Sequence, residues 1–211
     1  MNAHEFNRHA RKVASFRWLE DATAFVSEEM QRDGSHDFGH LLRVLRNASA
    51  ISDGETDSSE PDWEVIAAAS LTHDLVNLPK DHPERSRASS LSAERAAEFF
   101  DRLDVFDDHR IDILADAIRT HSFSAGLTPG YLESEIVCDA DRLEALGAFG
   151  IARCFQVSGM LERAIVDMSD PWADARQLDD YEYAVDHFFT KLLTLEHSFF
   201  TETGRQMASQ R

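Results

Sequence analysis

The chain is poor in lysine and in long apolar runs, and each shortage argues against a class of protein. Lysine occurs only at Lys12, Lys80 and Lys191, and 21 basic residues face 39 acidic ones, for a formal net charge of −18. Surfaces that bind nucleic acid or anionic membranes need clustered cations, so we expect neither partner. No stretch approaches the roughly 18 consecutive apolar residues of a membrane span.

Cysteine is also scarce. Cys138 and Cys154 are too few for a disulfide framework and lack the spacing of a cysteine metal site. The first twelve residues are polar, so no secretory signal is predicted. With 43% hydrophobic residues the chain can still bury a core. A cytoplasmic globular protein, monomeric or homodimeric, is the expectation.

Apolar residues recur at helical spacing along most of the chain, and no run alternates as a strand would. The repeats predict helices near 16–26, 41–48, 63–71 and 111–118, with a last long helix from about Asp179 to Phe200. No break between them is long enough for an inter-domain linker. Residues 1–211 are therefore predicted to form one all-α domain of about six to eight helices.

Three short segments gather the residue types that carry chemistry. They contain His36, Asp37 and His40; then the pair His73-Asp74; then Asp139, Asp141 and Arg142. Imidazole and carboxylate together suit a divalent ion such as Mn²⁺, Fe²⁺, Zn²⁺ or Mg²⁺. A few such ligands from separate helices would leave coordination positions open for water and substrate, as hydrolysis requires.

In this order the segments resemble the H…HD…D signature of the HD-domain metal-dependent phosphohydrolase superfamily. The run from Asp33 to Val44 keeps every marked position of the D-x-x-H-D-x-x-H-x-x-R-V opening of its small stand-alone bacterial branch. The likeness extends over most of the chain. It implies an HD-domain helical core at about 36–160, flanked by an N-terminal helix and a C-terminal helical region.

Residue by residue, the resemblance implies one divalent metal ion with four ligands, His40, His73, Asp74 and Asp141. His40 is preferred to His36 because it immediately precedes the x-x-Arg-Val run. Asp141 is preferred to Asp139 because it directly precedes Arg-Leu. The residues alone leave both choices open, and His36 and Asp37 are as well explained by helix capping and exposure as by function.

The implied activity is hydrolysis of a small phosphate ester or anhydride, most naturally a nucleotide. Asp74 is expected to hold the metal and accept a proton from water, and Asp37 is the candidate general acid. Residues expected to contact substrate are Lys80, Arg85, His36, His121 and Arg142. His121 is also a candidate for a second metal ion or for an ordinary position at a helix end.

Two other functions stay open at the level of sequence. One is a non-catalytic HD module that binds metal or nucleotide, and the other is an oxygenase with a dinuclear iron site. Asn77-Leu78 stands where HD enzymes that hydrolyse the stringent-response alarmone carry an acidic pair, which argues against that substrate. In so acidic a chain, any phosphate site must be a local island of positive charge.

Overall fold

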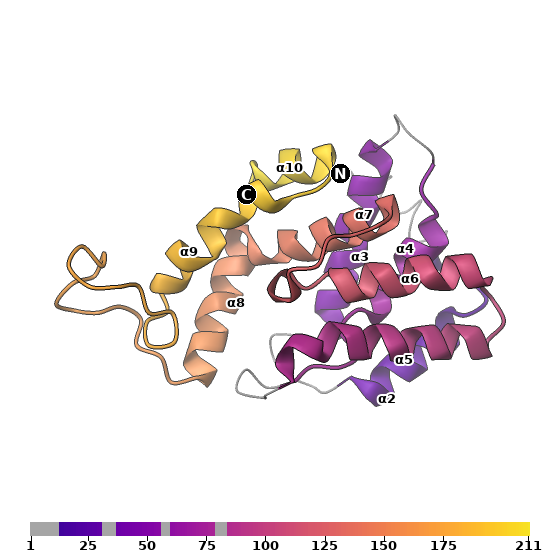
Figure 1. Ribbon diagram of the computed structural model, residues 1–211, viewed down its shortest axis with the longest axis horizontal. Coiled ribbons are helices and arrows are strands. Elements are labelled where there is room, and N and C mark those ends of the chain that lie inside the picture. Colours follow the sequence, from indigo (N-terminus) through magenta and orange to yellow (C-terminus); the bar gives the residue numbers. More distant parts are fainter. Residues whose placement is uncertain (1–12, 31–36, 56–59, 79–83) are drawn as a thin grey trace.

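The computed structural model describes residues 13–30, 37–55, 60–78 and 84–211. These residues form nine α-helices, and their only β contact is an isolated bridge between Ala164 and Tyr183. The α-helices are α2 (Leu19–Glu29), α3 (Phe38–Gly54), α4 (Trp63–Thr72), α5 (Ala88–Arg102), α6 (Asp108–Thr120), α7 (Leu132–Arg142), α8 (Gly147–Met160), α9 (Asp186–Thr190) and α10 (Glu202–Ala208). The 3-10 helices are η1 (Arg85–Arg87), η2 (Phe123–Ala125), η3 (Leu143–Ala145) and η4 (Leu192–Ser198). The predicted all-α fold is confirmed (Figure 1).

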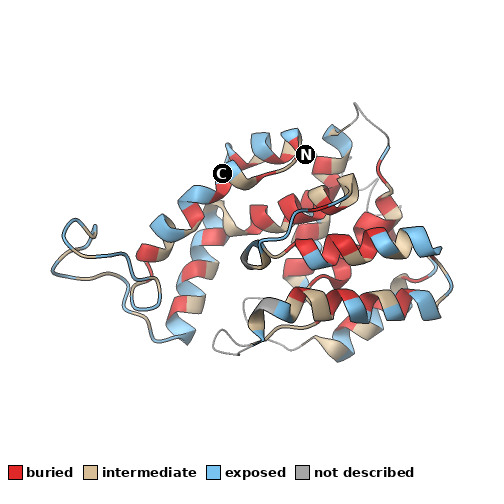
Figure 2. Cartoon of the chain, in the orientation of Figure 1, coloured by how far each residue is buried: buried red, intermediate tan, exposed pale blue. Residues whose placement is uncertain are grey.

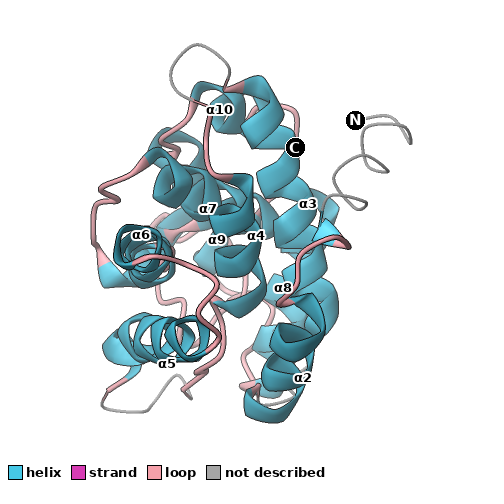
Figure 3. Cartoon of the chain, turned by 90° about the vertical axis from the view of Figure 1, so that its right-hand side faces the viewer, coloured by secondary structure: helices cyan, strands magenta, loops and turns pink. Residues whose placement is uncertain are grey.

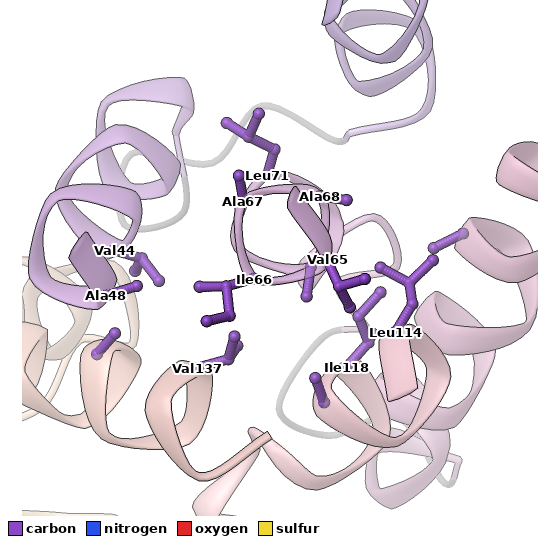
Figure 4. Close-up of a cluster of buried hydrophobic side chains, with 14 of the residues drawn as sticks. Val44, Ala48, Val65, Ile66, Ala67, Ala68, Leu71, Leu114, Ile118 and Val137 are labelled. Atoms are coloured by element: carbon purple, nitrogen blue, oxygen red, sulfur yellow. The ribbon is translucent and has the colours of Figure 1, made fainter. Parts of the chain in front are cut away.

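Helix α4 lies at the centre of the bundle, and all of its residues except Glu64 are buried. A helix that is apolar on every side can only be stable inside other elements. Helices α3, α6 and α7 surround it, and their side chains reach its surface in Figure 4. Figure 2 shows the consequence: burial is concentrated on α3, α4 and α7, while the outer helices bury one face. This packing fixes the position of the end of α4.

Helices α5 and α6 form a pair that covers one side of the core, and Figure 3 views both nearly end-on. An aromatic cluster packs at the end of the pair where α5 finishes, around Phe99 and Phe100. Trp18 meets Phe100 edge to face at 5.3 Å between ring centroids, and Phe25 stacks on Phe99 at 4.2 Å. The Trp18 indole N–H donates to Glu64 at 3.0 Å, which satisfies its polar atom in the core.

Side-chain caps explain where several helices begin. Asp62 accepts backbone N–H bonds from Glu64 and Val65 at the start of α4, at 3.1 and 3.3 Å. The same carboxylate forms a close ion pair with Arg110 of α6, at 2.9 Å. A cap of this kind satisfies amide groups that a helix leaves unpaired at its N-terminus. Asp62 therefore fixes both the start of α4 and its position against α6.

Residues 161–185 extend away from the helical body in Figure 1, between α8 and α9. The backbone bridge at Ala164 ties the two sides of this segment together. Arg176 donates to both carboxylate oxygens of Asp186 at 2.5 and 2.8 Å, and its guanidinium lies 4.6 Å from the Tyr183 ring centroid. The segment is thus ordered by polar contacts rather than by an apolar core.

The predicted long helix from about Asp179 to Phe200 is wrong. This stretch contains only the five-residue α9 and then η4, because Asp186 is drawn toward Arg176 and accepts the backbone N–H of Asp179 at 2.7 Å. In a 3-10 helix, residues three apart share a face. Leu192 and Leu195 use that spacing to pack together against Cys154 of α8. Tertiary contacts therefore override the apolar periodicity that suggested one helix.

None of the helices in the described ranges is both long enough and apolar enough to span a bilayer.

We expect Ile66→Ala to destabilise the protein by about 2–5 kcal/mol, because Ile66 is fully buried and points from α4 toward Val137 (Figure 4). Chemical denaturation of the metal-free protein measures this loss. Ile151→Ala on α8 is the matched control, since Ile151 is 49% exposed and should change the free energy of unfolding by no more than about 0.5 kcal/mol. Equal losses in the two variants would contradict the central position of α4.

Candidate active site

Three helices bring the predicted ligands to one place. His73 and Asp74 directly follow α4, His40 lies in the first turn of α3, and Asp141 lies in the last turn of α7. Both imidazoles are fully buried, and the two carboxylates are partly exposed. Residues 101 positions apart in the sequence thus share one site because α3 and α7 both pack on α4.

The donor atoms of these four side chains converge. The two Nε2 atoms of His40 and His73 are 3.3 Å apart. Each Nε2 lies 3.6 Å from Oδ2 of Asp74, and Oδ1 of Asp141 is 3.4 Å from His40 and 3.9 Å from His73. One ligand atom from each of His40, His73 and Asp74 lies within 4.8 Å of the others. Two imidazole nitrogens and carboxylate oxygens at this spacing fit a divalent ion, and Asp141 adjoins the set.

Backbone hydrogen bonds orient two of the histidines in this cluster. His73 Nδ1 is 3.0 Å from the Ser70 carbonyl, and His121 Nδ1 is 2.6 Å from the Ile118 carbonyl. A carbonyl only accepts, so each Nδ1 carries the proton and each Nε2 presents its lone pair when the ring is neutral. His121 Nε2 lies 3.6 Å from Oδ1 of Asp74, and its ring centroid lies 4.8 Å from that of His73. His121 therefore borders the proposed ligands directly.

The pKa values of the two buried histidines, His40 and His73, are shifted in opposite directions. Burial lowers the pKa of His73 to about 4, and the neighbouring Asp74 offsets this only in part. Burial also acts to lower the pKa of His40, but hydrogen bonds to Asp141 and Glu144 outweigh it and raise the pKa to about 9. Without metal, His40 thus carries a proton at neutral pH while His73 is neutral.

A polar network holds the other edge of His40. Arg153 Nη1 lies 3.4 Å from His40 Nδ1, and Glu144 Oε2 lies 3.8 Å from the same atom. Glu144 is itself buried, and it accepts from Arg43 at 2.5 Å and from Asn47 at 3.2 Å. Partners behind a metal-binding histidine commonly set its orientation and basicity. Arg43 is thereby engaged with Glu144.

The His36 alternative falls outside the described residues, whereas Asp37 is described. Asp37 is exposed, and its carboxylate accepts the backbone N–H of His40 at 2.8 Å as the cap of α3. This contact supports the capping interpretation and fixes the first turn that carries His40. The structure does not place Asp37 among the side chains that line the cavity described below.

Asp139 faces a different direction from Asp141, although only one residue separates them. Its fully buried carboxylate accepts the backbone N–H groups of Phe200 and Thr201, at 2.9 and 2.7 Å, and the Thr201 hydroxyl at 2.7 Å. Gly204 approaches so closely that an added Cβ would lie 2.5 Å from this carboxylate. Asp139 therefore anchors the C-terminal segment on α7, while Asp141 meets the two histidines.

Beside the histidines lies a cavity of about 580 Å³ whose walls are rich in cations. Asp74, Asp141 and His121 line it, together with Asp180. The cations in its described lining are Arg85, Arg142, Arg153, Arg163 and Lys191. In a chain of net charge −18, this excess of cations over carboxylates is a local positive region.

Two of the predicted substrate-binding cations reach the cavity but are also engaged with backbone. Arg85 donates to the Leu78 carbonyl, and Arg142 donates to the Ser198 carbonyl with its guanidinium 4.6 Å from the Phe200 ring centroid. Arg142 is buried, so only a small part of its side-chain surface faces the cavity. Lys80 lies outside the described residues.

Part of the cavity wall comes from residues that the sequence motifs did not predict. Asp180 and His187 form a pair at 2.7 Å, and Arg163 and Lys191 line the same space, although all four come from the chain beyond α8. The only signal for Lys191 was its rarity as one of three lysines. Short motifs gave no reason to connect this stretch with the histidines, because its position depends on long-range packing.

The chain is similar to proteins of one known family, both in sequence and in fold. The HD domain family matches residues 37–146. YpgQ of Bacillus subtilis (strain 168) is 31% identical over 182 residues, covering 83% of this chain and 77% of YpgQ. The crystal structure of Bacillus subtilis YpgQ in complex with ADP is similar with a TM-score of 0.62 and 27% identity, covering 92% of this chain and 88% of that one. An HD-superfamily hydrolase from Bacillus thuringiensis has a TM-score of 0.67 and 27% identity, with coverages of 96% and 90%. These likenesses extend well beyond the HD motif.

Metal binding should release protons near neutral pH. The pKa of His40 is raised to about 9, so an ion that binds its nitrogen at pH 7 must displace a proton, whereas neutral His73 supplies none. Calorimetric titration with Mn²⁺ in two buffers of different ionisation enthalpy should show release of about one proton at pH 7. The release should fall, and the apparent affinity should level off, as the pH passes 9. The same enthalpy in both buffers at pH 7 would contradict the charged state of His40.

Substitutions of Asp139 and Asp141 should have different effects, the first on stability and the second on metal affinity. Asp139→Asn replaces an acceptor of several N–H and O–H groups with a side chain that also donates, so we expect a loss of about 1–3 kcal/mol in unfolding free energy with little change in metal affinity. Asp141→Asn should weaken metal binding by at least about tenfold. Denaturation and Mn²⁺ titration of both variants measure the two effects, and an equal loss of metal affinity in both would refute the distinction.

Proposed function

Because the chain belongs to the HD-domain superfamily, we propose that it is a metal-dependent phosphohydrolase that acts on a small phosphate ester or anhydride, preferably a nucleotide. The observation that carries this proposal is the convergence of His40, His73, Asp74 and Asp141 at the wall of a cation-lined cavity. The HD-superfamily hydrolase from Bacillus thuringiensis, at 27% identity over nearly the whole chain, supports the reaction class.

The four side chains would hold one divalent ion. Such an ion, when bound, supplies Lewis acidity toward a phosphoryl oxygen and lowers the pKa of water. The buried imidazoles of His40 and His73 provide neutral nitrogen donors once His40 has lost its proton. The carboxylates of Asp74 and Asp141 complete a set of hard and borderline donors suited to Mn²⁺, Fe²⁺, Zn²⁺ or Mg²⁺.

Asp74 has a second role in this proposal. Its Oδ2 faces both histidine Nε2 atoms, and its Oδ1 faces His121 Nε2 at 3.6 Å. It also lines the cavity, so one carboxylate can hold the metal and accept a proton from the attacking water. The charge of Asp74 raises the pKa of His121 despite burial, which favours an imidazolium beside the substrate.

A nucleotide suits the cavity in size and charge. Its volume of about 580 Å³ lies within the roughly 300–1,000 Å³ typical of small-molecule sites. Arg85, from the chain between Asp74 and Asp141, and Arg153, on α8, add positive charge to the lining, which suits phosphate oxygens. The relative YpgQ, 31% identical, has been crystallised in complex with ADP, and this supports a nucleotide ligand here.

The test is a screen of the purified protein against nucleoside mono-, di- and triphosphates, with each divalent metal in turn, for released phosphate or pyrophosphate. We expect turnover with at least one pair, and a loss of at least about a thousandfold in His73→Ala and Asp74→Ala because each removes a metal ligand. His197→Ala is the control, since His197 is 81% exposed and lies outside the cavity lining. Activity that persists in both ligand variants would refute the assignment, as would metal binding without any turnover.

A further inference from the structure

Lys191 reaches the cavity from a part of the chain that the HD family match does not include. It directly follows α9, where its backbone, with φ −138° and ψ −61°, ends the helix. Its N–H still donates to the His187 carbonyl at 3.1 Å. The family match ends at residue 146, so Lys191 belongs to the C-terminal segment that closes the cavity over the motif.

An aromatic ring holds the Lys191 ammonium beside the candidate metal ligands. Nζ lies 5.4 Å from the ring centroid of Phe123, within the range of a cation–π contact. Phe123 begins η2 only two residues after His121, whose Nε2 faces Asp74. The ring therefore links the position of Lys191 to the wall of the site that carries Asp74.

The charges around Lys191 favour an anionic ligand. Burial is the main cause that lowers the pKa of Lys191; Arg153 and Arg85 repel its ammonium and lower the pKa further, whereas Asp141 and Asp180 attract it and oppose the shift. Like charges collected in one partly buried space destabilise each other, and an anion bound among them relieves that repulsion. The placement is therefore unfavourable in the empty cavity and favourable with a phosphate group present.

Three of the four other cations in the described lining are engaged with other groups. Arg142 and Arg85 donate to backbone carbonyls, and Arg153 lies 3.4 Å from His40 Nδ1. Within the described ranges, no hydrogen bond or ion pair is formed by Lys191 Nζ. An ammonium group is a compact charge with three donors and can turn toward whichever oxygen is presented.

We propose that Lys191 is a catalytic residue that binds a non-bridging oxygen of the reacting phosphate group on the side of the cavity facing Asp141. This inference rests on the proposed phosphohydrolase function. It identifies the C-terminal segment as part of the catalytic apparatus, with Phe123 as a positioning residue for Lys191. Charge developing on the phosphoryl oxygens would be stabilised by an ammonium already in place.

The test compares Lys191→Gln, Lys191→Arg and Phe123→Leu with the wild-type protein, using the substrate and metal found in the screen. Loss of a charge-assisted hydrogen bond should lower kcat/KM roughly 10- to 100-fold in Lys191→Gln, with about tenfold of the loss in KM and the rest in kcat. Lys191→Arg keeps the charge and should recover at least about fivefold of that loss. Phe123→Leu keeps apolar volume but removes the ring, so a loss of roughly two- to tenfold is expected.

Arg95→Gln is the control for net charge, because exposed Arg95 pairs with Glu29 away from the cavity; it should leave kcat/KM within about twofold of wild type. Unchanged kcat/KM in Lys191→Gln, or equal losses in Lys191→Gln and Lys191→Arg, would overturn the inference.

Binding of ADP to the metal-free protein, measured by calorimetry, separates this inference from the proposed function. Lys191→Gln should weaken ADP binding by about tenfold relative to wild type and to Arg95→Gln. If the wild type turns over no substrate, the phosphohydrolase proposal fails, yet this difference in ADP affinity still supports phosphate binding by Lys191. Equal ADP affinity in all three proteins overturns it whatever the outcome of the activity screen.

Discussion

The burial of α4 on every side is the constraint on which the rest of the structure depends. Its side chains meet those of α3, α6 and α7, and in Figure 4 Ile66 points toward Val137 of α7 while Val65 points toward Leu114 of α6. The helix ends where His73 and Asp74 follow, and the helices around it deliver His40 and Asp141 to the same point. A cluster of two buried imidazoles and two partly exposed carboxylates is costly to assemble, and the apolar packing of α4 offsets that cost.

Charge is distributed unevenly between the surface and the cavity. The chain carries a net charge of −18, yet the described lining of the cavity beside the histidines contains more cations than carboxylates. An acidic exterior repels polyanions at low salt, whereas a small phosphate can enter a local positive region. The opposite pKa shifts of His40 and His73 arise in the same place, because one ring faces carboxylates on two sides while burial dominates the other.

The C-terminal segment is part of the site rather than an appendage. The Asp139 carboxylate on α7 accepts hydrogen bonds from the backbone N–H groups of Phe200 and Thr201. These bonds tie the start of α10 to the helix that carries Asp141. Between α8 and this anchor, the chain brings Lys191 and the Asp180–His187 pair to the cavity. A single buried carboxylate thus connects the fold of the last residues with the geometry of the candidate metal ligands.

The sequence by itself determined the all-α class, the approximate positions of α2, α3, α4 and α6, and the ordered motif that contains His40, His73, Asp74 and Asp141. These features are local, since apolar periodicity and short-range spacing are properties of neighbouring residues. Only the tertiary structure decided that 179–200 is no single helix, that Asp139 turns away from Asp141, and that Lys191 faces the cavity. Each of these depends on contacts between residues far apart in the chain, whose energies no local pattern records.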